Sequence, residues 1–257
     1  MPVTYVLEGH TAVITLDRPE ALNAIDLEMW DGFGAATAKF AADAEAWVGI
    51  VTGAGPRAFC AGADVKTSLR AMMDDPRSGK FKHPATIMRG QVVEKPLIAA
   101  VNGLALGGGL EIALACDIRI AARTARFGAP EVGLGAIPGW GATQRLPRHV
   151  LWAVATKMIL SGEMISADEA LACGLVSKLV EPDELMDEAR KVAAQLCTRA
   201  PAALVAAKKA MVAALNLPLE EGLATELELF NGLAYTEDVR EGIEAFEQKR
   251  PPVFKGK

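Results

Sequence analysis

Two glutamates are the strongest candidates for proton-transfer chemistry in this sequence. Glu111 follows the glycine run 107–109 at the predicted start of an apolar helix, and its neighbours at helical spacing are Gly, Leu and Ala, none of which can pair with a carboxylate. Burial without a partner disfavours the charged form of a carboxylate and raises its pKa, which suits proton exchange near neutral pH. The alternative is a partly exposed Glu111 that the helix dipole stabilises.

Glu131 lies twenty residues further on, in the uncharged, loop-like segment 127–135. The next stretch, 136–146, is again rich in glycine ahead of a predicted helix. The first turn of a helix presents unpaired N–H groups, and glycine lets a ligand oxygen approach them closely. Two carboxylates in apolar settings and two glycine-led helix starts indicate acid and base catalysis beside an oxyanion site. The spacing alone does not bring the carboxylates together, and the run 107–109 equally allows tight packing of a helix on a sheet.

A third segment, 58–66, follows the aliphatic run 48–52 and can supply a second N–H group to an oxyanion site. On this segment alone a simpler interpretation is favoured. It is then an ordinary connection from a strand to a helix, in which Asp64 caps the helix.

The composition excludes several classes of protein. The 257 residues include 27 Lys and Arg against 32 Asp and Glu, and the resulting net charge of −5 disfavours nucleic acid as a partner. Hydrophobic residues make up 51%, which at this length predicts a globular protein with one sizeable core. The start of the chain resembles no secretory signal, so we expect a cytoplasmic protein. The apolar window 96–116 contains Asn102, Glu111 and a glycine run, so we expect a core segment and no membrane partner.

The sequence lacks the motifs of several other reaction classes. It has no phosphate-binding loop, no Gly-x-Ser-x-Gly and no His-Glu-x-x-His. Three histidines are too few and too scattered for a metal site built on histidine. The cysteines are widely separated, so we expect free, mostly buried thiols and no metal site; they are Cys60, Cys116, Cys173 and Cys197.

Hydrophobic periodicity predicts the elements that position these residues. Alternation predicts a hairpin of strands at 3–8 and 11–16. Asp26 is a predicted N-cap for a helix that runs to residue 44, with Leu27, Trp30, Phe33 and Ala36 on one face. Parallel strands with helical crossovers are predicted at 48–52, 97–101 and 118–121. Helices are predicted at 151–160, 167–172, 183–198, 202–215, 219–234 and 239–248, with a strand at 175–180 and a loop at 74–84.

Four segments together resemble the crotonase, or enoyl-CoA hydratase/isomerase, superfamily. They are 18–24, 61–65, 102–111 and the C-terminal 246–256. The resemblance implies an α/β fold, a spiral of repeated ββα turns with a helical C-terminal region used in trimerisation. It also implies a homotrimer or a hexamer made of two trimers. We expect residues 1–195 to form the spiral core and 196–257 the helical region, within one folding unit.

The resemblance also implies roles for individual residues. Glu111 and Glu131 match the two carboxylates of hydratases, and the backbone N–H groups of Ala63 and Gly108 match the oxyanion hole. Coenzyme A is then part of the substrate, and no separate cofactor is expected. The substrate-contacting positions implied are Leu22, Ala24, Ala61, Asp64, Val65, Gly139 and Trp140.

Possession of both glutamates favours an enoyl-CoA hydratase, a lyase of fatty acid metabolism that adds water reversibly to a 2-enoyl-CoA. The alternatives are a related lyase or isomerase, such as a specialised 3-hydroxyacyl-CoA dehydratase, and a noncatalytic member that binds acyl-CoA or RNA. In the hydratase, we expect Glu111 to orient and deprotonate the water and Glu131 to supply the α-carbon proton; the alternative is that both carboxylates hold one water. Trp140 replaces a small residue of many hydratases, so its indole either shapes the acyl pocket or packs outside it.

Overall fold

The computed structural model describes residues 1–71 and 84–257, so the predicted loop 74–84 lies outside the described residues except for Pro84. The chain begins with the predicted hairpin of β1 (Val3–Glu8) and β2 (Thr11–Leu16), which pair antiparallel along their whole length. A short 3-10 helix, η1 (Pro19–Ala21), then leads to α1 (Leu27–Ala42).

The N-terminus of α1 forms as predicted, because the carboxylate of Asp26 accepts a hydrogen bond of 2.8 Å from the N–H of Met29. The predicted buried face is wrong at one position. Leu27 is 45% exposed, whereas Met29, Trp30 and Phe33 are buried. The 3.6-residue period of the helix turns Leu27 away from the stripe that contacts the sheet.

Repeated ββα turns follow, as the resemblance implies. The first has β3 (Val48–Gly53), β4 (Ala58–Cys60) and the short helix η2 (Val65–Leu69). The second has β5 (Leu97–Val101), β6 (Leu104–Leu106) and α3 (Gly108–Ala115). The third has β7 (Ile118–Ala122), β8 (Arg126–Gly128), the 3-10 helix η3 (Pro130–Leu134) and α4 (Ala142–His149).

Each turn contributes one strand to each of two sheets. The larger sheet has the order β1-β2-β3-β5-β7-β10, and the smaller has β4-β6-β8-β9. The remaining elements of the core are α5 (Trp152–Ser161), β9 (Ile165–Ser166), α6 (Ala167–Ala172), β10 (Lys178–Val180), η4 (Pro182–Glu184) and α7 (Leu185–Cys197). The strand predicted at 175–180 is shorter in the structure, where β10 covers only Lys178–Val180. The strands of the smaller sheet have two or three residues each, which is too short for a clear hydrophobic periodicity.

Both faces of the central strands β3, β5 and β7 are covered, which explains their largely aliphatic sequences. One face packs against a large core that includes residues of α1 and α3, and the other packs against Leu185, Ala189 and Ala193 of α7. Cys60 and Cys116 are buried free thiols, while Cys173 and Cys197 are only half-buried. The apolar window 96–116 lies almost wholly inside this core.

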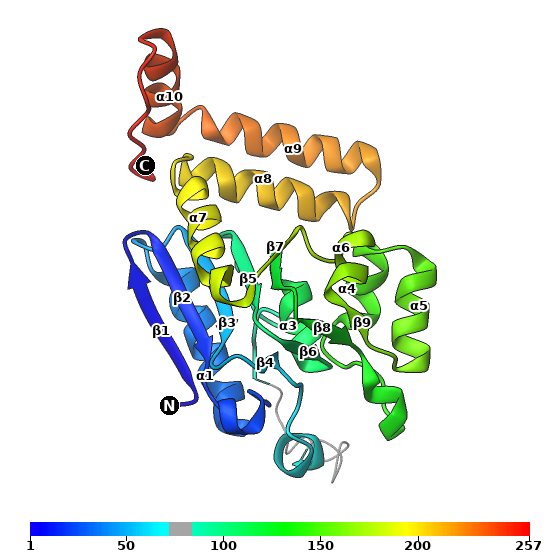
Figure 1. Ribbon diagram of the computed structural model, residues 1–257. Coiled ribbons are helices and arrows are strands. Elements are labelled where there is room, and N and C mark those ends of the chain that lie inside the picture. Colours follow the sequence, from blue (N-terminus) through cyan, green and yellow to red (C-terminus); the bar gives the residue numbers. More distant parts are fainter. Residues whose placement is uncertain (72–83) are drawn as a thin grey trace.

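The C-terminal helices α8 (Pro201–Ala214), α9 (Leu219–Leu233) and α10 (Glu237–Glu247) extend away from the sheets. Figure 1 shows α8 and α9 side by side above the sheets, with α10 projecting beyond them. They expose apolar side chains that include Met211, Leu219, Leu227, Phe230 and Phe246. None of the described helices is both long and apolar enough to cross a membrane. The expected division at residue 195 stays a prediction.

Candidate active site

Backbone hydrogen bonds join two segments that are distant in the sequence. The N–H of Ala61 donates to the carbonyl of Leu22 at 3.0 Å. The N–H of Ile25 donates to the carbonyl of Gly62 at 2.8 Å, and the N–H of Asp64 donates back to Ile25 at 2.9 Å. The predicted substrate-contacting residues of 22–24 and 61–65 therefore lie together; they are Leu22, Ala24, Ala61, Asp64 and Val65.

Two polar side chains that sequence reasoning missed hold this junction. The Arg18 guanidinium donates to the carbonyl of Ala24 at 2.6 Å and pairs with Asp64 at 3.4 Å. Asn23 is fully buried, accepts from the N–H of Arg18 at 2.9 Å and donates to the carbonyl of Ala58 at 2.8 Å. Its φ of 54° follows a φ of 55° at Leu22, so the turn is strained at Leu22 and held by these contacts.

Asp64 also caps η2, because its carboxylate accepts from the N–H of Lys66 at 3.0 Å. The simpler interpretation of segment 58–66 is therefore confirmed as far as it concerns the cap. The cap does not exclude a role of this segment in the oxyanion hole. The junction with Ile25 uses the carbonyl of Gly62 and the N–H of Asp64, so the N–H of Ala63 takes no part in it.

The N–H groups of Ala63 and Gly108 lie close together because glycines allow their backbones to approach. A Cβ on Gly62 would lie 2.9 Å from the carbonyl oxygen of Leu106, and a Cβ on Gly109 would collide with the carbonyl of Cys60. A Cβ on Gly108 would be only 3.7 Å from the nitrogen of Ala63. In residues 1–71 and 84–257 neither N–H donates an internal hydrogen bond, so both can bind an anionic oxygen.

Glu111 is fully buried on α3, so the alternative of a partly exposed side chain is wrong. Its Oε1 accepts from the N–H groups of Trp140 at 2.7 Å and Ala142 at 3.0 Å, while its buried Oε2 has no partner among the described residues. The pKa of Glu111 is raised to about 7, mainly by burial and also by the charge of Glu131, against the opposing effect of the two N–H groups. This carboxylate can exchange a proton near neutral pH.

Glu131 lies on η3 and faces the same space. Its Oε1 is 3.0 Å from the position that a Cβ on Gly107 would occupy, and Gly107 directly precedes α3. Burial raises the pKa of Glu131, and its Oε2 is also buried without a partner in the described part of the chain. The structure therefore brings the two predicted carboxylates and the two predicted N–H donors to one place beside Gly107.

The turn 139–142 supplies the groups that hold Glu111. Gly141 has a φ of 118°, a conformation that favours glycine, and the two donors lie on either side of it. Ala142 was missed because it carries no functional side chain, although the glycine-rich start of a helix was the signal. Gly139 lies at the exposed side of this turn, and its role stays a prediction.

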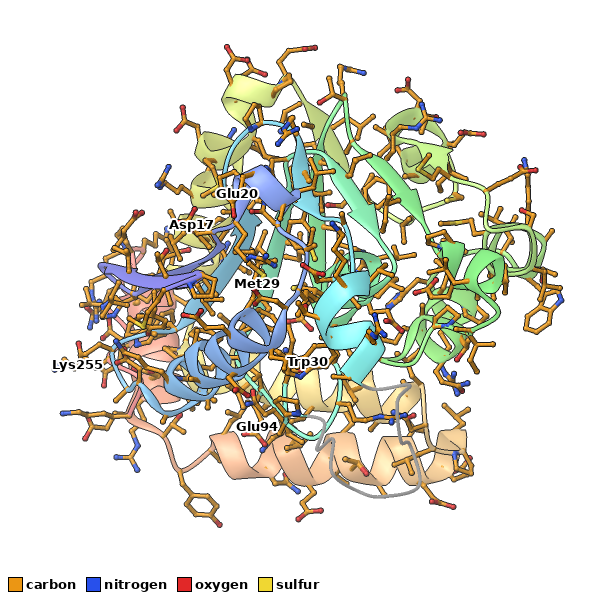
Figure 2. All side chains as sticks on the ribbon, turned by 90° about the horizontal axis from the view of Figure 1, so that it is seen from below. Asp17, Glu20, Met29, Trp30, Glu94 and Lys255 are labelled. Carbon is orange, nitrogen blue, oxygen red and sulfur yellow. The ribbon has the colours of Figure 1, made fainter. Side chains whose placement is uncertain are left out.

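The indole of Trp140 packs in the core, while its backbone N–H binds Glu111. Its ring centroid is 4.3 Å from that of Trp30, at an angle of 59° between the rings. Trp30 of α1, labelled in Figure 2, is buried, and its Nε1–H donates to the carbonyl of Pro84 at 3.2 Å. Trp30 also lines a narrow apolar gap with Met29, Met88 and Ile112. The effect of Trp140 on the acyl group stays a prediction.

The sequence pattern of the family described as Enoyl-CoA hydratase/isomerase matches residues 7–257. The chain belongs to this family. It is 44% identical over 256 residues to (E)-benzylidenesuccinyl-CoA hydratase of Thauera aromatica, in an alignment that covers both chains in full. It is 43% identical over 243 residues to short-chain-enoyl-CoA hydratase of Clostridium acetobutylicum, over 95% of this chain and 93% of that one. The match to the solved enoyl-CoA hydratase of Bacillus anthracis covers both chains in full, with a TM-score of 0.93 at 36% identity.

Membership of the enoyl-CoA hydratase/isomerase family confirms the predicted fold class, an α/β spiral with a helical C-terminal region. It also confirms an enzyme of the hydro-lyase type with the general activity of an enoyl-CoA hydratase. These findings do not support the alternative of a noncatalytic member that binds acyl-CoA or RNA.

Proposed function

We propose that this enzyme adds water reversibly to the α,β double bond of a 2-enoyl-CoA thioester, with Glu111 and Glu131 as its catalytic residues. One observation in the described part of the chain carries the proposal. Glu111 and Glu131 have raised pKa values, and each has a buried Oε2 without a hydrogen-bond partner there. The N–H groups of Ala63 and Gly108, which donate no internal hydrogen bond in this part of the chain, lie beside them. Buried polar atoms without partners are rare in proteins, and here they supply two acceptors for one water molecule.

The oxyanion hole consists of the N–H groups of Ala63 and Gly108, which receive the thioester oxygen. Water forms a C–O bond at the β-carbon, and the electron pair of the double bond moves through the α-carbon to that oxygen. Two preorganised donors stabilise the resulting enolate, and each contributes about 10²–10³ in rate. Hydration starts with Glu111 ionised and Glu131 protonated. Glu111 takes the proton from the water, and Glu131 gives its proton to the α-carbon, which completes the 3-hydroxyacyl product. The proton then returns from Glu111 to Glu131 through solvent water before the next turnover.

The coenzyme A moiety binds at the junction of segments 18–26 and 61–65. Their backbone groups are held by the Arg18 and Asn23 contacts, and Val65 is exposed at the start of η2. Because the thioester is part of the substrate, the proposed chemistry uses neither a metal nor a separate cofactor.

The acyl group extends from the β-carbon toward the pair formed by Trp30 and Trp140. Trp30 and Trp140 pack against each other with little exposed surface, so this aromatic pair limits the width of the acyl group on that side. The relative of Thauera aromatica is named for an aromatic acyl-CoA. Aromatic enoyl-CoA thioesters therefore belong in the substrate panel with short, long and branched ones.

Dehydration is the second candidate direction. Another relative, at 41% identity over 255 residues, is the carnitinyl-CoA dehydratase of Salmonella enteritidis. The same two carboxylates and N–H donors serve both directions, so the 3-hydroxyacyl-CoA of each panel member is assayed as well.

We propose a homotrimer or a hexamer of two trimers, and a location in the cytoplasm. The exposed apolar residues of α8, α9 and α10 support the association of subunits. Sedimentation equilibrium of the full chain measures this directly. A stable monomer would contradict it without bearing on the chemistry.

The decisive experiment is the hydration of the enoyl-CoA panel by the purified protein, followed by loss of the conjugated thioester absorbance and identification of the product. We expect turnover in the native protein and a collapse of turnover in Glu111→Gln, with coenzyme A binding retained. Absence of turnover on every panel member, or an undiminished rate in Glu111→Gln, would refute the proposal.

A further inference from the structure

Arg145 links the turn 139–142 to a separate segment of the chain. Its guanidinium donates to the carbonyl of Trp140 at 3.0 Å and to the carbonyl of Met88 at 2.9 Å, and its backbone N–H donates to the carbonyl of Gly141 at 2.7 Å. A Cβ on Gly141 would collide with the guanidinium, so the cation packs directly on the glycine between the two donors to Glu111.

We infer that Arg145 is a positioning residue for Glu111, acting through the turn 139–142; this rests on the proposed role of Glu111 as the base. The two N–H groups that hold Glu111 belong to Trp140 and Ala142, which flank Gly141. Glycine has the most backbone freedom of any residue, so a turn built on it needs outside contacts to stay in one conformation. Arg145 supplies such contacts from a single residue on α4.

The charge of Arg145 has a second effect on the same carboxylate. The guanidinium lowers the pKa of Glu111, opposing burial and the charge of Glu131 on η3, which both raise it. Burial lowers the pKa of the half-buried Arg145, and Glu111 in turn raises it. Cys116 at the end of α3 also faces Arg145. His149 stays neutral near pH 7, because burial and the charges of Arg119 and Arg145 lower its pKa to about 4.

Loss of Arg145 therefore acts on Glu111 twice, and both effects have the same sign. A looser turn weakens the two hydrogen bonds that favour the carboxylate, and the loss of the cation removes a favourable charge. Each raises the pKa of Glu111, so a smaller fraction is ionised at neutral pH, and the remaining base is less well oriented. A residue that only stabilises the fold would change neither property.

The experiment compares Arg145→Gln and Arg145→Lys with the matched control Arg148→Gln. Arg148 lies on the same helix α4, is exposed and donates to the carbonyl of Gln144 at 2.7 Å. For Arg145→Gln we expect kcat to fall by about tenfold to a hundredfold, since small displacements of a catalytic group cost that much. We expect the KM to stay within about threefold, because the coenzyme A contacts lie on other segments. Arg148→Gln should keep the native kcat.

The pH profile separates positioning from folding. We expect the acid limb of kcat/KM to move up by about one pH unit in Arg145→Gln. Lysine keeps the charge but not the two-pronged geometry, so Arg145→Lys should lose kcat with a smaller movement of the limb. Carbon-13 NMR of labelled glutamate, with the Glu111 signal assigned from Glu111→Gln, measures the same pKa change without any assay of activity.

The outcomes separate this inference from the proposed function. Full activity in Glu111→Gln refutes the proposed function. An inactive Glu111→Gln with a native kcat in Arg145→Gln refutes the inference alone, as does a fall in kcat with an unmoved Glu111 pKa. If Arg145→Gln does not fold, Arg145→Lys decides: a native kcat refutes the inference, and a reduced kcat with a raised Glu111 pKa supports it.

Discussion

The two carboxylates of the site are held in opposite ways. Glu111 lies on a buried helix, with one oxygen bound by two backbone N–H groups. Glu131 is half-buried on the short helix η3, which ends at the exposed Leu134. A base that must orient a water molecule gains from rigid placement, whereas an acid that follows the α-carbon through the reaction gains from room to adjust. The contrast teaches that one site can combine a fixed group with an adjustable one.

The strongest test of the different roles of Glu111 and Glu131 compares hydration and α-proton exchange in the variants Glu111→Gln and Glu131→Gln. We expect Glu111→Gln and Glu131→Gln each to lower hydration of crotonyl-CoA by about 10³-fold, within the usual range for a lost general acid or base. In deuterium oxide, a saturated acyl-CoA exchanges its α-proton without any addition of water. Exchange should therefore persist in Glu111→Gln and vanish in Glu131→Gln, as read by mass spectrometry. The reverse pattern would exchange the two roles.

Stability should depend on pH through Glu111. Its pKa rises from an ordinary value of 4.5 to about 7 on folding, so between these values the folded state binds more protons than the unfolded state. The free energy of unfolding then falls by about 3 kcal/mol as pH rises through this window, because a pKa difference of one between the two states corresponds to about 1.4 kcal/mol. Glu111→Gln removes this dependence, so the variant should gain stability over the native protein as pH rises.

Chemical denaturation at about pH 5 and about pH 8 measures this difference directly. Glutamine keeps an oxygen for the N–H groups of Trp140 and Ala142, so the variant retains the local hydrogen bonds. Glu131→Gln is the matched control, with a smaller effect expected because Glu131 is only half-buried. An equal pH dependence in the native protein and in Glu111→Gln would contradict the raised pKa.

A Gly→Ala substitution near Glu111 should lower the free energy of unfolding more than one near Glu131. A Cβ on Gly109 collides with the carbonyl of Cys60, whereas a Cβ on Gly133 of η3 meets nothing within 4 Å. We expect Gly109→Ala to lower the free energy of unfolding by about 2 kcal/mol, as overpacking in a core does. Gly133→Ala should change it by less than about 0.5 kcal/mol. Equal losses, measured by urea denaturation, would show that Glu131 is held as tightly as Glu111.

The parts of this site that could be predicted from the sequence are those with local signals. Asp26 before an apolar periodic run predicts a capped helix, and glycines before an apolar run predict the N–H groups at the start of α3. Glu111 and Glu131 stand out because their neighbours are apolar, which local sequence also shows.

The groups that hold those residues could not be predicted, because they come from far along the chain or have no functional side chain. Ala142 contributes only a backbone N–H, whose direction depends on the φ of Gly141. Arg145 donates to the carbonyl of Met88, which is 57 residues away in the sequence, and Arg18 donates to Asp64, which is 46 residues away. Neither arginine has a sequence neighbour that identifies its partner, so only the fold reveals them.

The smallest expected effect is a change in the pKa of Glu111 when Glu131 is replaced, and it tests whether the two carboxylates interact. The charge of Glu131 raises the pKa of Glu111, so Glu131→Gln should lower that pKa. Arg145→Gln is expected to raise the pKa of Glu111, so the two variants should change it in opposite directions. In Glu131→Gln the pKa should fall by less than about 1, because burial is the larger cause of the raised pKa. Carbon-13 titration of Glu111 reads it even though turnover is lost. An unmoved pKa would mean that Glu131 carries no charge that acts on Glu111 while Glu111 titrates, and the electrostatic coupling between the two carboxylates would be refuted.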